Sequence, residues 1–222
     1  MIPLYHDFSD ATVLVVGGGS VGARKARRFA REARVVVLSP RFDSAFDDAP
    51  AVERVRVAPT ADDVSTWLDR VAPALVVAAT DDDGLNGAIA AAASERGVLV
   101  NRTDRSGGRD ADSVVVPATV EEPPVSVAVS TGGTSPALAA YLRERLEPEL
   151  DGAGAMADLT GRLRAALKAE SRPAAERREA IRAVVRSPSV WKALHTPTAN
   201  AREEAERVMA KLNMDDDRGE RR

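Results

Sequence analysis

The sequence predicts an α/β fold: a parallel sheet in the first half, then a small α+β region and an all-α C-terminal domain. Short apolar runs such as Thr12–Val16 and Ala74–Ala79 alternate with helical segments. A glycine-rich turn, Gly17–Gly22, directly follows the first run and opens a helix. Strands that alternate with helices favour right-handed crossovers, and therefore parallel pairing.

The predicted elements of the first half follow one another with the spacing of β–α units. We expect strands at 12–16, 34–38, 52–57, 74–79 and 98–100, and helices at 23–33, 63–71 and 84–96. The apolar runs at 12–16 and 74–79 are continuous rather than alternating, which is typical of strands buried on both faces. In such sheets, ligands bind beyond the carboxyl ends of the strands. The segments in that position are Gly17–Gly22, Ser39–Arg41, Thr80–Asp83 and Asn101–Asp104.

A different pattern begins after residue 112. Ser113–Val120 and Val125–Ser130 predict an antiparallel hairpin, and a helix is expected to begin near Pro136 and to end at Pro148. This helix carries an apolar stripe, made of Leu138, Tyr141, Leu142 and Leu146. A hairpin and one helix are too small to bury a core of their own. We therefore expect the region to pack against a second copy, which predicts a homodimer.

From residue 151 onward the pattern is entirely helical. Met156, Leu159, Leu163 and Leu167 recur at helical spacing, and further helices are expected at 174–186, 190–194 and 199–212, before a charged tail over 214–222. The predicted domains are therefore a Rossmann-type unit at 1–112, a dimerisation region at 113–150 and a helical domain at 151–222.

The composition excludes several classes of protein. The chain has no cysteine, which removes disulfides, thiol catalysis and thiolate metal sites. It has no apolar run long enough to span a membrane, and its start lacks the features of a signal peptide, so we expect a cytoplasmic protein. The net charge is −3, which argues against nucleic acid as the main partner. Lysines are few, and arginine supplies most of the positive charge.

The glycine run fits the dinucleotide-binding pattern G-x-G-x-x-G through Gly17, Gly19 and Gly22. The first glycine permits a tight turn, the second a close approach of pyrophosphate, and the third close packing of helix on strand. Backbone N–H groups of Ser20 and Val21 are then placed to meet phosphate. The pattern predicts NAD binding on a Rossmann-type sheet; the alternative is a purely structural glycine turn.

The ribose site departs from the common NAD pattern. About twenty residues past the glycines, NAD enzymes usually carry a carboxylate; this chain has Ser39, Pro40 and Arg41. Ser39 and Arg41 are candidate cofactor ligands, and Arg41 suits a 2′-phosphate, so NADP stays open beside NAD. An ordinary surface role for Arg41 is equally open, and the missing carboxylate disfavours a flavin.

Acidic residues follow two other strands. Asp81, Asp82 and Asp83 resemble a metal site, but adjacent carboxylates at a strand–helix junction more often cap the helix, so we predict no metal site. Thr80 and Asp81 are instead candidate ligands of the nicotinamide ribose. Asp104 follows a strand tip on the same edge and is the candidate general base, with a simple turn residue as the alternative.

The two histidines carry no catalytic expectation. His6 precedes the first strand and is predicted to be a packing residue, and His195 lies in a polar stretch after a helix.

Several segments resemble one family, the precorrin-2 dehydrogenases, which form the dehydrogenase–ferrochelatase module of sirohaem synthesis. The segments are IPLYHDF, VLVVGGGSVGARKARRF, LVVAATDDDGLN, VLVNRTD and VVVPATVEEPPVSVAVSTGGTSPALAAYLRERLE. The glycines are shared by many families, whereas AATDD–LN followed by STGGTSPALA–LRE is far more specific. The resemblance spans residues 2–147 in the family's order.

The resemblance implies an NAD-dependent oxidation of precorrin-2 to sirohydrochlorin by a dimer, with a site formed by the cofactor domain and elements of both subunits. It maps the family's aspartate onto Asp104, and some members also use ferrous iron as a substrate. It implies a substrate pocket shaped in part by one loop and one strand tip; the residues are Asn101, Ser130, Thr131, Gly132, Gly133, Thr134 and Ser135. An arginine-rich rim would suit the substrate's carboxylates, with Arg102, Arg105 and Arg109 as candidates.

The sequence departs from the family pattern at two places, and two other functions are alternatives. The stretch after Asp104 is longer than the family usually has, so Asp110 or Asp112 could share or replace its role. Arg105 also stands where small or acidic residues are common. The alternative function is a non-catalytic NAD(H)-sensing module with a helical partner-binding domain. A methyltransferase using S-adenosylmethionine is disfavoured by the TDDD–N pattern.

Overall fold

The protein is described here by a computed structural model covering residues 2–49, 51–105 and 113–219, with side chains described to residue 212. It divides into two compact units. One contains the residues up to Val116 together with Gly132–Thr134, and the other contains Pro117–Thr131 and the residues from Ser135 onward.

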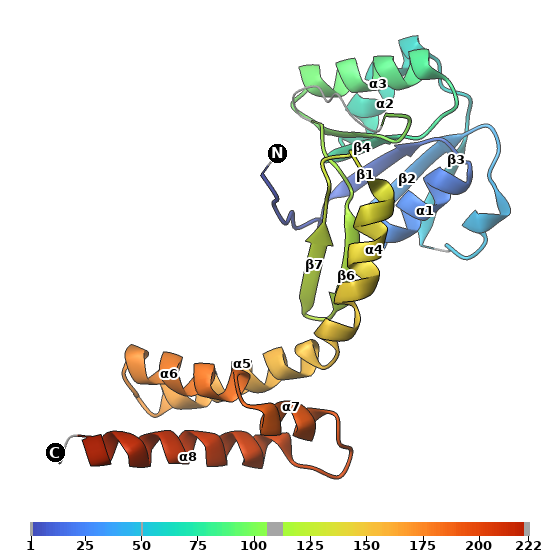
Figure 1. The fold of residues 1–222 in the computed structure, drawn as a ribbon. Helices are drawn as coiled ribbons and strands as arrows, with labels where there is room; N and C mark the ends of the chain where they lie inside the picture. The colour runs from blue at the N-terminus through green and yellow to red at the C-terminus, as the bar shows by residue number, and fades with distance from the viewer. Residues whose placement is uncertain (1, 50, 106–112, 220–222) are drawn as a thin grey trace. The chain divides into compact units, whose positions relative to one another are not determined.

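The first unit is built on a parallel five-stranded sheet with the order β3-β2-β1-β4-β5 (Figure 1). The strands are β1 (Thr12–Val16), β2 (Arg34–Ser39), β3 (Val52–Arg56), β4 (Leu75–Ala78) and β5 (Leu99–Arg102). Val15 of β1 lies between Val37 of β2 and Val77 of β4. The chain therefore steps outward from β1 to β3 and returns to the other side of β1. The carboxyl ends of β1 and β4 flank the point of reversal, where such sheets bind ligands.

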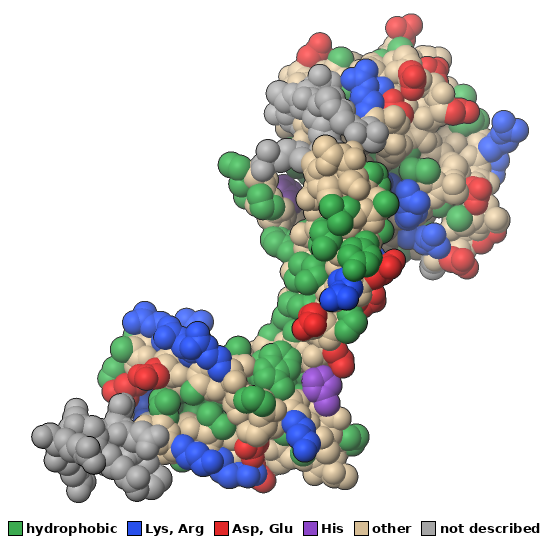
Figure 2. Space-filling model, in the orientation of Figure 1, with side chains coloured by type: hydrophobic (Ala, Val, Ile, Leu, Met, Phe, Trp, Pro, Cys, Tyr) green, Lys and Arg blue, Asp and Glu red, His purple; other side chains and the backbone are tan. Residues whose placement is uncertain are grey.

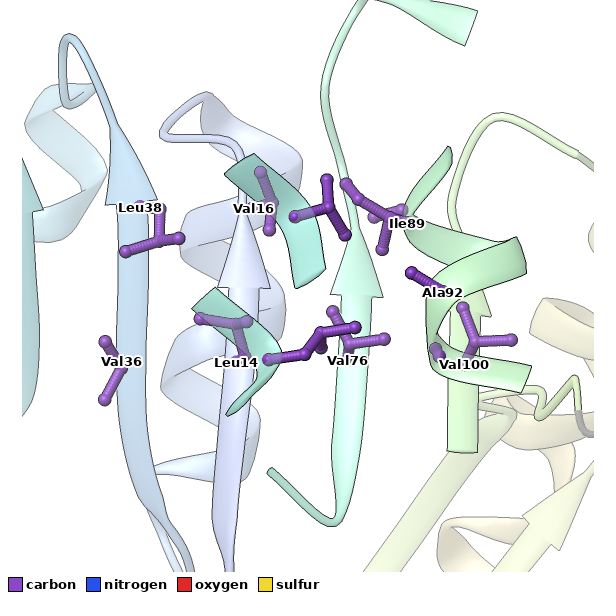
Figure 3. Packing of buried hydrophobic residues seen from close by; sticks show 12 residues of the cluster. Leu14, Val16, Val36, Leu38, Val76, Ile89, Ala92 and Val100 are labelled. Atoms are coloured by element: carbon purple, nitrogen blue, oxygen red, sulfur yellow. The ribbon is translucent and has the colours of Figure 1, made fainter. Parts of the chain in front are cut away.

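Helices cover both faces of this sheet, which explains why the central strands β1, β2 and β4 carry continuous apolar runs. Ala23 and Ala26 of α1 (Ser20–Phe29) pack on one face. On the other face lie α2 (Val64–Val71) and α3 (Asp83–Glu95), which contribute Leu68 and Ile89 to the core. Figure 3 shows residues of this second face: strand residues Leu14, Val16, Val36, Leu38, Val76 and Val100, with Ile89 and Ala92 from α3. The predicted Rossmann-type α/β fold is confirmed.

The second unit begins with an antiparallel hairpin of β6 (Ala118–Glu122) and β7 (Val125–Val129). Its two-residue turn contains a cis peptide bond between Pro123 and Pro124. Helix α4 (Pro136–Leu146) packs against β6 and is followed by the short 3-10 helix η3 (Pro148–Leu150). The helix expected to begin near Pro136 and to end at Pro148 is therefore confirmed.

The rest of the second unit is helical. The helices are α5 (Ala153–Ala169), α6 (Ala174–Val185), α7 (Pro188–Leu194) and α8 (Ala201–Gly219). Their shared core contains Met156, Leu159, Leu163, Val184, Val190 and Ala205, all buried. The last helix was expected to end at Leu212; in the structure it continues to Gly219, because the polar residues of the tail do not interrupt helical backbone. Among the helices described, none is long and apolar enough to cross a membrane.

The buried sheet makes a direct stability prediction. Leu14→Ala removes a side chain that is 1% exposed in the centre of β1, so we expect it to destabilise the first unit by about 2–5 kcal/mol. The chain has two tryptophans, Trp67 in the first unit and Trp191 in the second. Denaturant unfolding followed by Trp67 fluorescence in a Trp191→Phe background measures the first unit alone.

The matched control makes the same substitution at Leu4, which is 85% exposed. Leu4→Ala is expected to change stability by no more than about 0.5 kcal/mol. Equal effects of the two substitutions would contradict the buried central strand.

Candidate active site

The glycine loop is held close to the neighbouring strands. Gly17, at the end of β1, donates its N–H to the carbonyl of Leu38 at 3.0 Å and has φ of +122°, a conformation that favours glycine. A Cβ at Gly17 would lie 2.2 Å from the carbonyl oxygen of Ala79, and one at Gly22 would lie 2.1 Å from that of Gly17. The two glycines therefore allow β1, β4 and α1 to approach more closely than any side chain permits.

The middle glycine has a different environment. A Cβ at Gly19 would meet nothing within 4 Å, so this position faces open space. Gly19 is also the N-cap of α1, and no side chain among the described residues caps it. The N–H groups of the first turn, from Ser20 and Val21 onward, are left for a ligand, and the helix dipole favours an anion there.

A cavity of about 600 Å³ lies beyond this loop, within the range usual for small-molecule sites. Its lining residues come from the carboxyl ends of β1, β2, β3 and β4 and from the start of α3: Val16, Gly17, Gly18, Gly19, Leu38, Ser39, Pro40, Arg41, Phe42, Asp43, Ala58, Pro59, Ala79, Thr80, Asp81, Asp82 and Leu85. The cavity thus brings together most of the predicted cofactor ligands, which come from three separate segments.

Two of the predicted cofactor ligands, Ser39 and Arg41, have environments that differ from each other. Ser39 is buried, and its hydroxyl donates to the carbonyl of Arg41 at 2.6 Å, so it shapes the turn. Arg41 is exposed at the mouth of the cavity, where the ribose carboxylate of NAD enzymes is missing.

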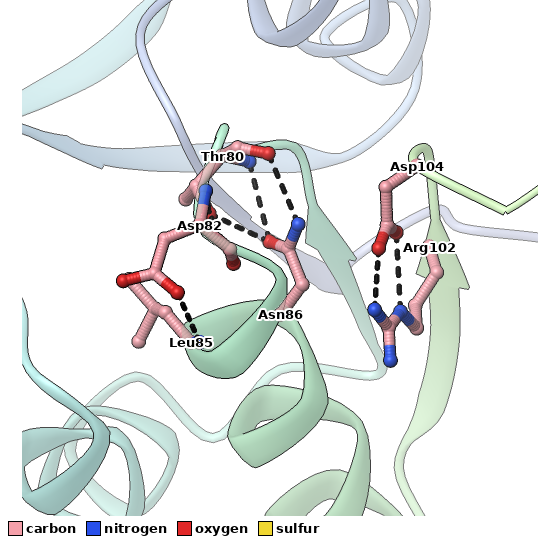
Figure 4. A network of polar contacts seen from close by, with 6 residues as sticks. All are labelled: Thr80, Asp82, Leu85, Asn86, Arg102 and Asp104. Atoms are coloured by element: carbon pink, nitrogen blue, oxygen red, sulfur yellow. Dashed lines mark hydrogen bonds and ion pairs between the residues drawn. The ribbon is translucent and has the colours of Figure 1, made fainter.

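The β4 tip is fixed by a residue that the sequence prediction missed. Asn86, fully buried in the first turn of α3, accepts a hydrogen bond from the Thr80 hydroxyl at 2.8 Å and donates to the Thr80 carbonyl at 3.0 Å (Figure 4). Asp82 caps the same helix by accepting from the N–H of Leu85 at 3.0 Å, as the cap interpretation predicted. The available signal was an asparagine placed one turn into an apolar helix.

Asp104 lies just beyond β5 and is engaged by Arg102. The guanidinium Nε donates to one carboxylate oxygen at 3.1 Å, and a terminal nitrogen contacts the other (Figure 4). The two side chains are only 11% and 16% exposed. The Arg102 hydrogen bond holds the pKa of the Asp104 carboxyl below its ordinary value of 3.8, burial opposes this, and Asn86 adds a smaller lowering effect. The predicted base is therefore ionised near neutral pH.

Asn101 is placed as part of the scaffold. It is 6% exposed, and its amide donates to the carbonyl of Val114 at 2.8 Å, which ties β5 to the segment that follows residues 106–112. Its amide oxygen is buried and has no hydrogen-bond partner among the described residues. Asp110, Asp112 and Arg109 lie outside the described residues.

The second predicted loop, Ser130–Ser135, is held by its own hydroxyl groups. The Thr131 hydroxyl donates to the carbonyl of Ser135 at 3.0 Å and accepts from its N–H at 3.1 Å. Ser135 caps α4 by accepting from Leu138 at 3.3 Å. Gly132 and Gly133 have positive φ values of +67° and +88°. The loop is thus a pre-formed turn, and Thr134 is exposed on it.

Neither histidine lies among these groups. His6 is exposed and contacts Phe8, with ring centroids 4.4 Å apart in a tilted arrangement. His195 contacts the carbonyl of Trp191 at 2.8 Å and Asp151 at 3.3 Å at the end of α7. Among the described residues, no group of three or more acidic or histidine side chains could hold a metal ion.

These features define the class of protein. An open position at the N-terminus of α1, two glycine close approaches and a cavity beyond the strand ends fit a dinucleotide, whose pyrophosphate the free N–H groups would hold. The fold and the loop are those of a Rossmann-type dinucleotide-binding protein.

Comparison with known proteins gives the family. A family model described as NAD(P)-binding matches residues 4–118, and one described as the central part of a sirohaem biosynthesis protein matches 124–148. A precorrin-2 dehydrogenase of Methanosarcina barkeri is 33% identical over 218 residues, which cover 94% of this chain and 93% of that protein. The chain belongs to the precorrin-2 dehydrogenase and sirohaem synthase family, and carries an NAD(P)-binding domain.

Two further similarities define the extent of the match. A sirohaem synthase of Stutzerimonas stutzeri is 36% identical over 94% of this chain, which spans only 43% of that longer protein. A solved structure of SirC, a precorrin-2 dehydrogenase, matches with a TM-score of 0.70 over 95% of this chain and all of that one, at 19% identity. This second similarity confirms the fold of the whole chain.

The open position at Gly19 predicts a specific cofactor defect. Gly19→Asp has room in the free protein, but its carboxylate would crowd and repel pyrophosphate. We expect NAD⁺ affinity, measured by calorimetry, to fall at least about tenfold, with unfolding unchanged. The control is Gly161→Asp on α5, where a Cβ also meets nothing within 4 Å. Wild-type affinity in Gly19→Asp would refute the phosphate-loop assignment.

Proposed function

We propose that this chain oxidises precorrin-2 to sirohydrochlorin with NAD⁺. Precorrin-2 gives up one hydride and one proton, so that precorrin-2 and NAD⁺ become sirohydrochlorin, NADH and H⁺. The observation that carries the proposal is an ionised carboxylate, Asp104, at the same sheet edge as the cofactor cavity. Asn86 connects the two because it bonds to Thr80 in the cavity wall and acts on Asp104.

The chain's residues have separate tasks in this reaction. The first turn of α1, at Ser20 and Val21, would hold the pyrophosphate, and Thr80 and Asp81 line the part of the cavity assigned to the nicotinamide ribose. When bound, NAD⁺ supplies the hydride acceptor. Asp104 then takes the proton, since general bases act in their ionised form. The predicted substrate contacts of Asn101 and of the Ser130–Ser135 loop stay predictions.

The cofactor preference and the second activity belong to the same proposal. Arg41 at the cavity mouth suits a 2′-phosphate, so NADP⁺ is tested beside NAD⁺. Ferrous iron is the candidate second substrate, for insertion into sirohydrochlorin by the same carboxylate, Asp104. A cytoplasmic location stays a prediction from the sequence.

The active form is proposed to be a homodimer formed through α4. Three large apolar side chains on one side of this helix are exposed: Leu138 by 47%, Tyr141 by 55% and Leu142 by 37%. Figure 2 shows hydrophobic side chains gathered on the surface over α4. A second copy would remove this apolar surface from water, and contiguous apolar patches on a surface typically mark such interfaces.

The first experiment is an anaerobic assay with enzymatically generated precorrin-2 and NAD⁺ or NADP⁺. Sirohydrochlorin and reduced cofactor are expected to appear together in equal amounts. Asp104→Ala is expected to lower kcat by about 10²–10⁴-fold, because it removes the base, while NAD⁺ affinity changes little. Adding ferrous iron to the product then tests chelation.

The control for this variant is Asp158→Ala, an exposed aspartate on α5. Unchanged turnover in Asp104→Ala would remove its assignment as base. If the wild-type chain binds NAD⁺ and produces neither product, the NAD(H)-sensing alternative is favoured.

The dimer is tested by Tyr141→Glu, which places a charge in the centre of the apolar stripe. We expect the dimer dissociation constant to rise at least about tenfold in sedimentation experiments. Ala140→Glu, an exposed alanine on the opposite side of α4, is the matched control. A wild-type sedimentation profile for Tyr141→Glu would place the interface elsewhere.

A further inference from the structure

Arg102 binds Asp104, the carboxylate that the proposed chemistry needs as its base. Both carboxylate oxygens contact the same guanidinium, one at Nε and one at a terminal nitrogen. Such a two-point contact is among the strongest that a carboxylate makes. It lowers the proton affinity of Asp104, so the pair in this form is a weak and obstructed base.

Among the described residues around Asp104, Arg102 is the one that lowers the proton affinity of the carboxylate most. Of the groups in the described part of the chain that act on the carboxylate, Arg102 is the charged one, and Asn86 from α3 contributes a neutral amide. On the other side, the guanidinium lies against Gly87 of α3, where a Cβ would be 3.8 Å from a terminal nitrogen. The absence of a side chain at Gly87 therefore leaves space beside the guanidinium.

We propose that Arg102 is a positioning residue that binds Asp104 in the free enzyme and passes to a carboxylate of the tetrapyrrole when substrate binds, which releases Asp104 as the base. This inference rests on the proposed function. Precorrin-2 is a polycarboxylate, and the planar fork of arginine binds any carboxylate in the same two-point manner.

For Arg102 the exchange costs little, because one carboxylate replaces another. A buried cation that loses its partner is strongly destabilised, whereas one that gains a new carboxylate keeps its charge compensated. Asp104 meanwhile loses its strongest contact and becomes a better proton acceptor. Binding of the correct, anionic substrate would thus activate the base that acts on it.

The test measures binding and pH dependence separately. Arg102→Gln is expected to weaken binding of sirohydrochlorin, the polycarboxylate product, at least about tenfold in an anaerobic fluorescence titration. It is also expected to raise KM for precorrin-2. Arg102→Lys keeps the charge and is expected to recover part of this loss. Arg96→Gln breaks another arginine–aspartate pair, with Asp69 at 2.8 Å, and should leave both values unchanged.

The pH dependence of the kinetic constants distinguishes a carboxylate exchange at Arg102 from an Arg102–Asp104 pair that only holds the structure. The profile of kcat/KM reports the free enzyme and that of kcat the substrate complex. In the wild type, the acid limb of kcat is expected at higher pH than that of kcat/KM, because Asp104 has lost its cation in the complex. In Arg102→Gln the two limbs should coincide.

Failure of the carboxylate exchange and failure of the proposed function give different experimental results. Wild-type sirohydrochlorin affinity in Arg102→Gln, or coincident limbs in the wild type, would overturn the exchange even where precorrin-2 is oxidised. Failure of the wild type to oxidise precorrin-2 would refute the proposed function, and the titration would still decide whether Arg102 binds the tetrapyrrole. Cofactor affinity and circular dichroism verify that each variant is folded.

Discussion

The close approach of three backbone segments at Gly17 is the constraint on which the rest of the first unit depends. With the end of β4 only 2.2 Å from the position of a Cβ, any side chain there would push β1 away from Ala79. Gly22 imposes the same demand between α1 and the loop. Since the cavity is bounded by these elements, its width follows from the missing side chains rather than from any polar ligand. This is why a loop almost without functional groups organises the cofactor site.

Most of the polar contacts lie on the other side of the point where the strand order reverses, around the first turn of α3. Asp82 caps the helix, Asn86 fixes Thr80, and the same amide acts on Asp104. The start of α3 thus fixes the tip of β4 and adds a small effect on the carboxylate that follows β5. A buried amide with its hydrogen bonds made is stable and directional, whereas a charged residue here would add its own field. Because Asn86 is neutral, Arg102 is the charged group among the described residues that lowers the proton affinity of Asp104.

Much of this was predictable because burial on both faces leaves a clear trace in sequence. The run at residues 12–16 is β1 without change, and the glycine run predicted that a helix follows the loop. That helix was expected at 23–33; in the structure it is α1 at Ser20–Phe29, because helical backbone begins directly after Gly19. Asn86 was missed because periodicity ignores which polar residue faces inward, and the end of α8 because residues after Leu212 carry no breaking signal. The Arg102–Asp104 pair was missed because Asp104 lies past the end of β5, where the alternation of a strand no longer predicts the direction of a side chain. Whether Ser39 or Arg41 meets the cofactor depends on side-chain hydrogen bonds, which spacing does not encode.

The two halves of the site differ in how they achieve selectivity. The glycine loop of the cofactor half would act through N–H groups that the start of α1 fixes before the ligand arrives, which limits the entropy lost on binding. The substrate half, as proposed, holds its base in an ion pair that another anion, such as a substrate carboxylate, must replace. A neutral or cationic molecule in the site would leave Arg102 on Asp104, and the base would stay engaged. Selection for an anionic tetrapyrrole would then operate at the proton-transfer step as well as at binding, through the one arginine that lies two residues before the base.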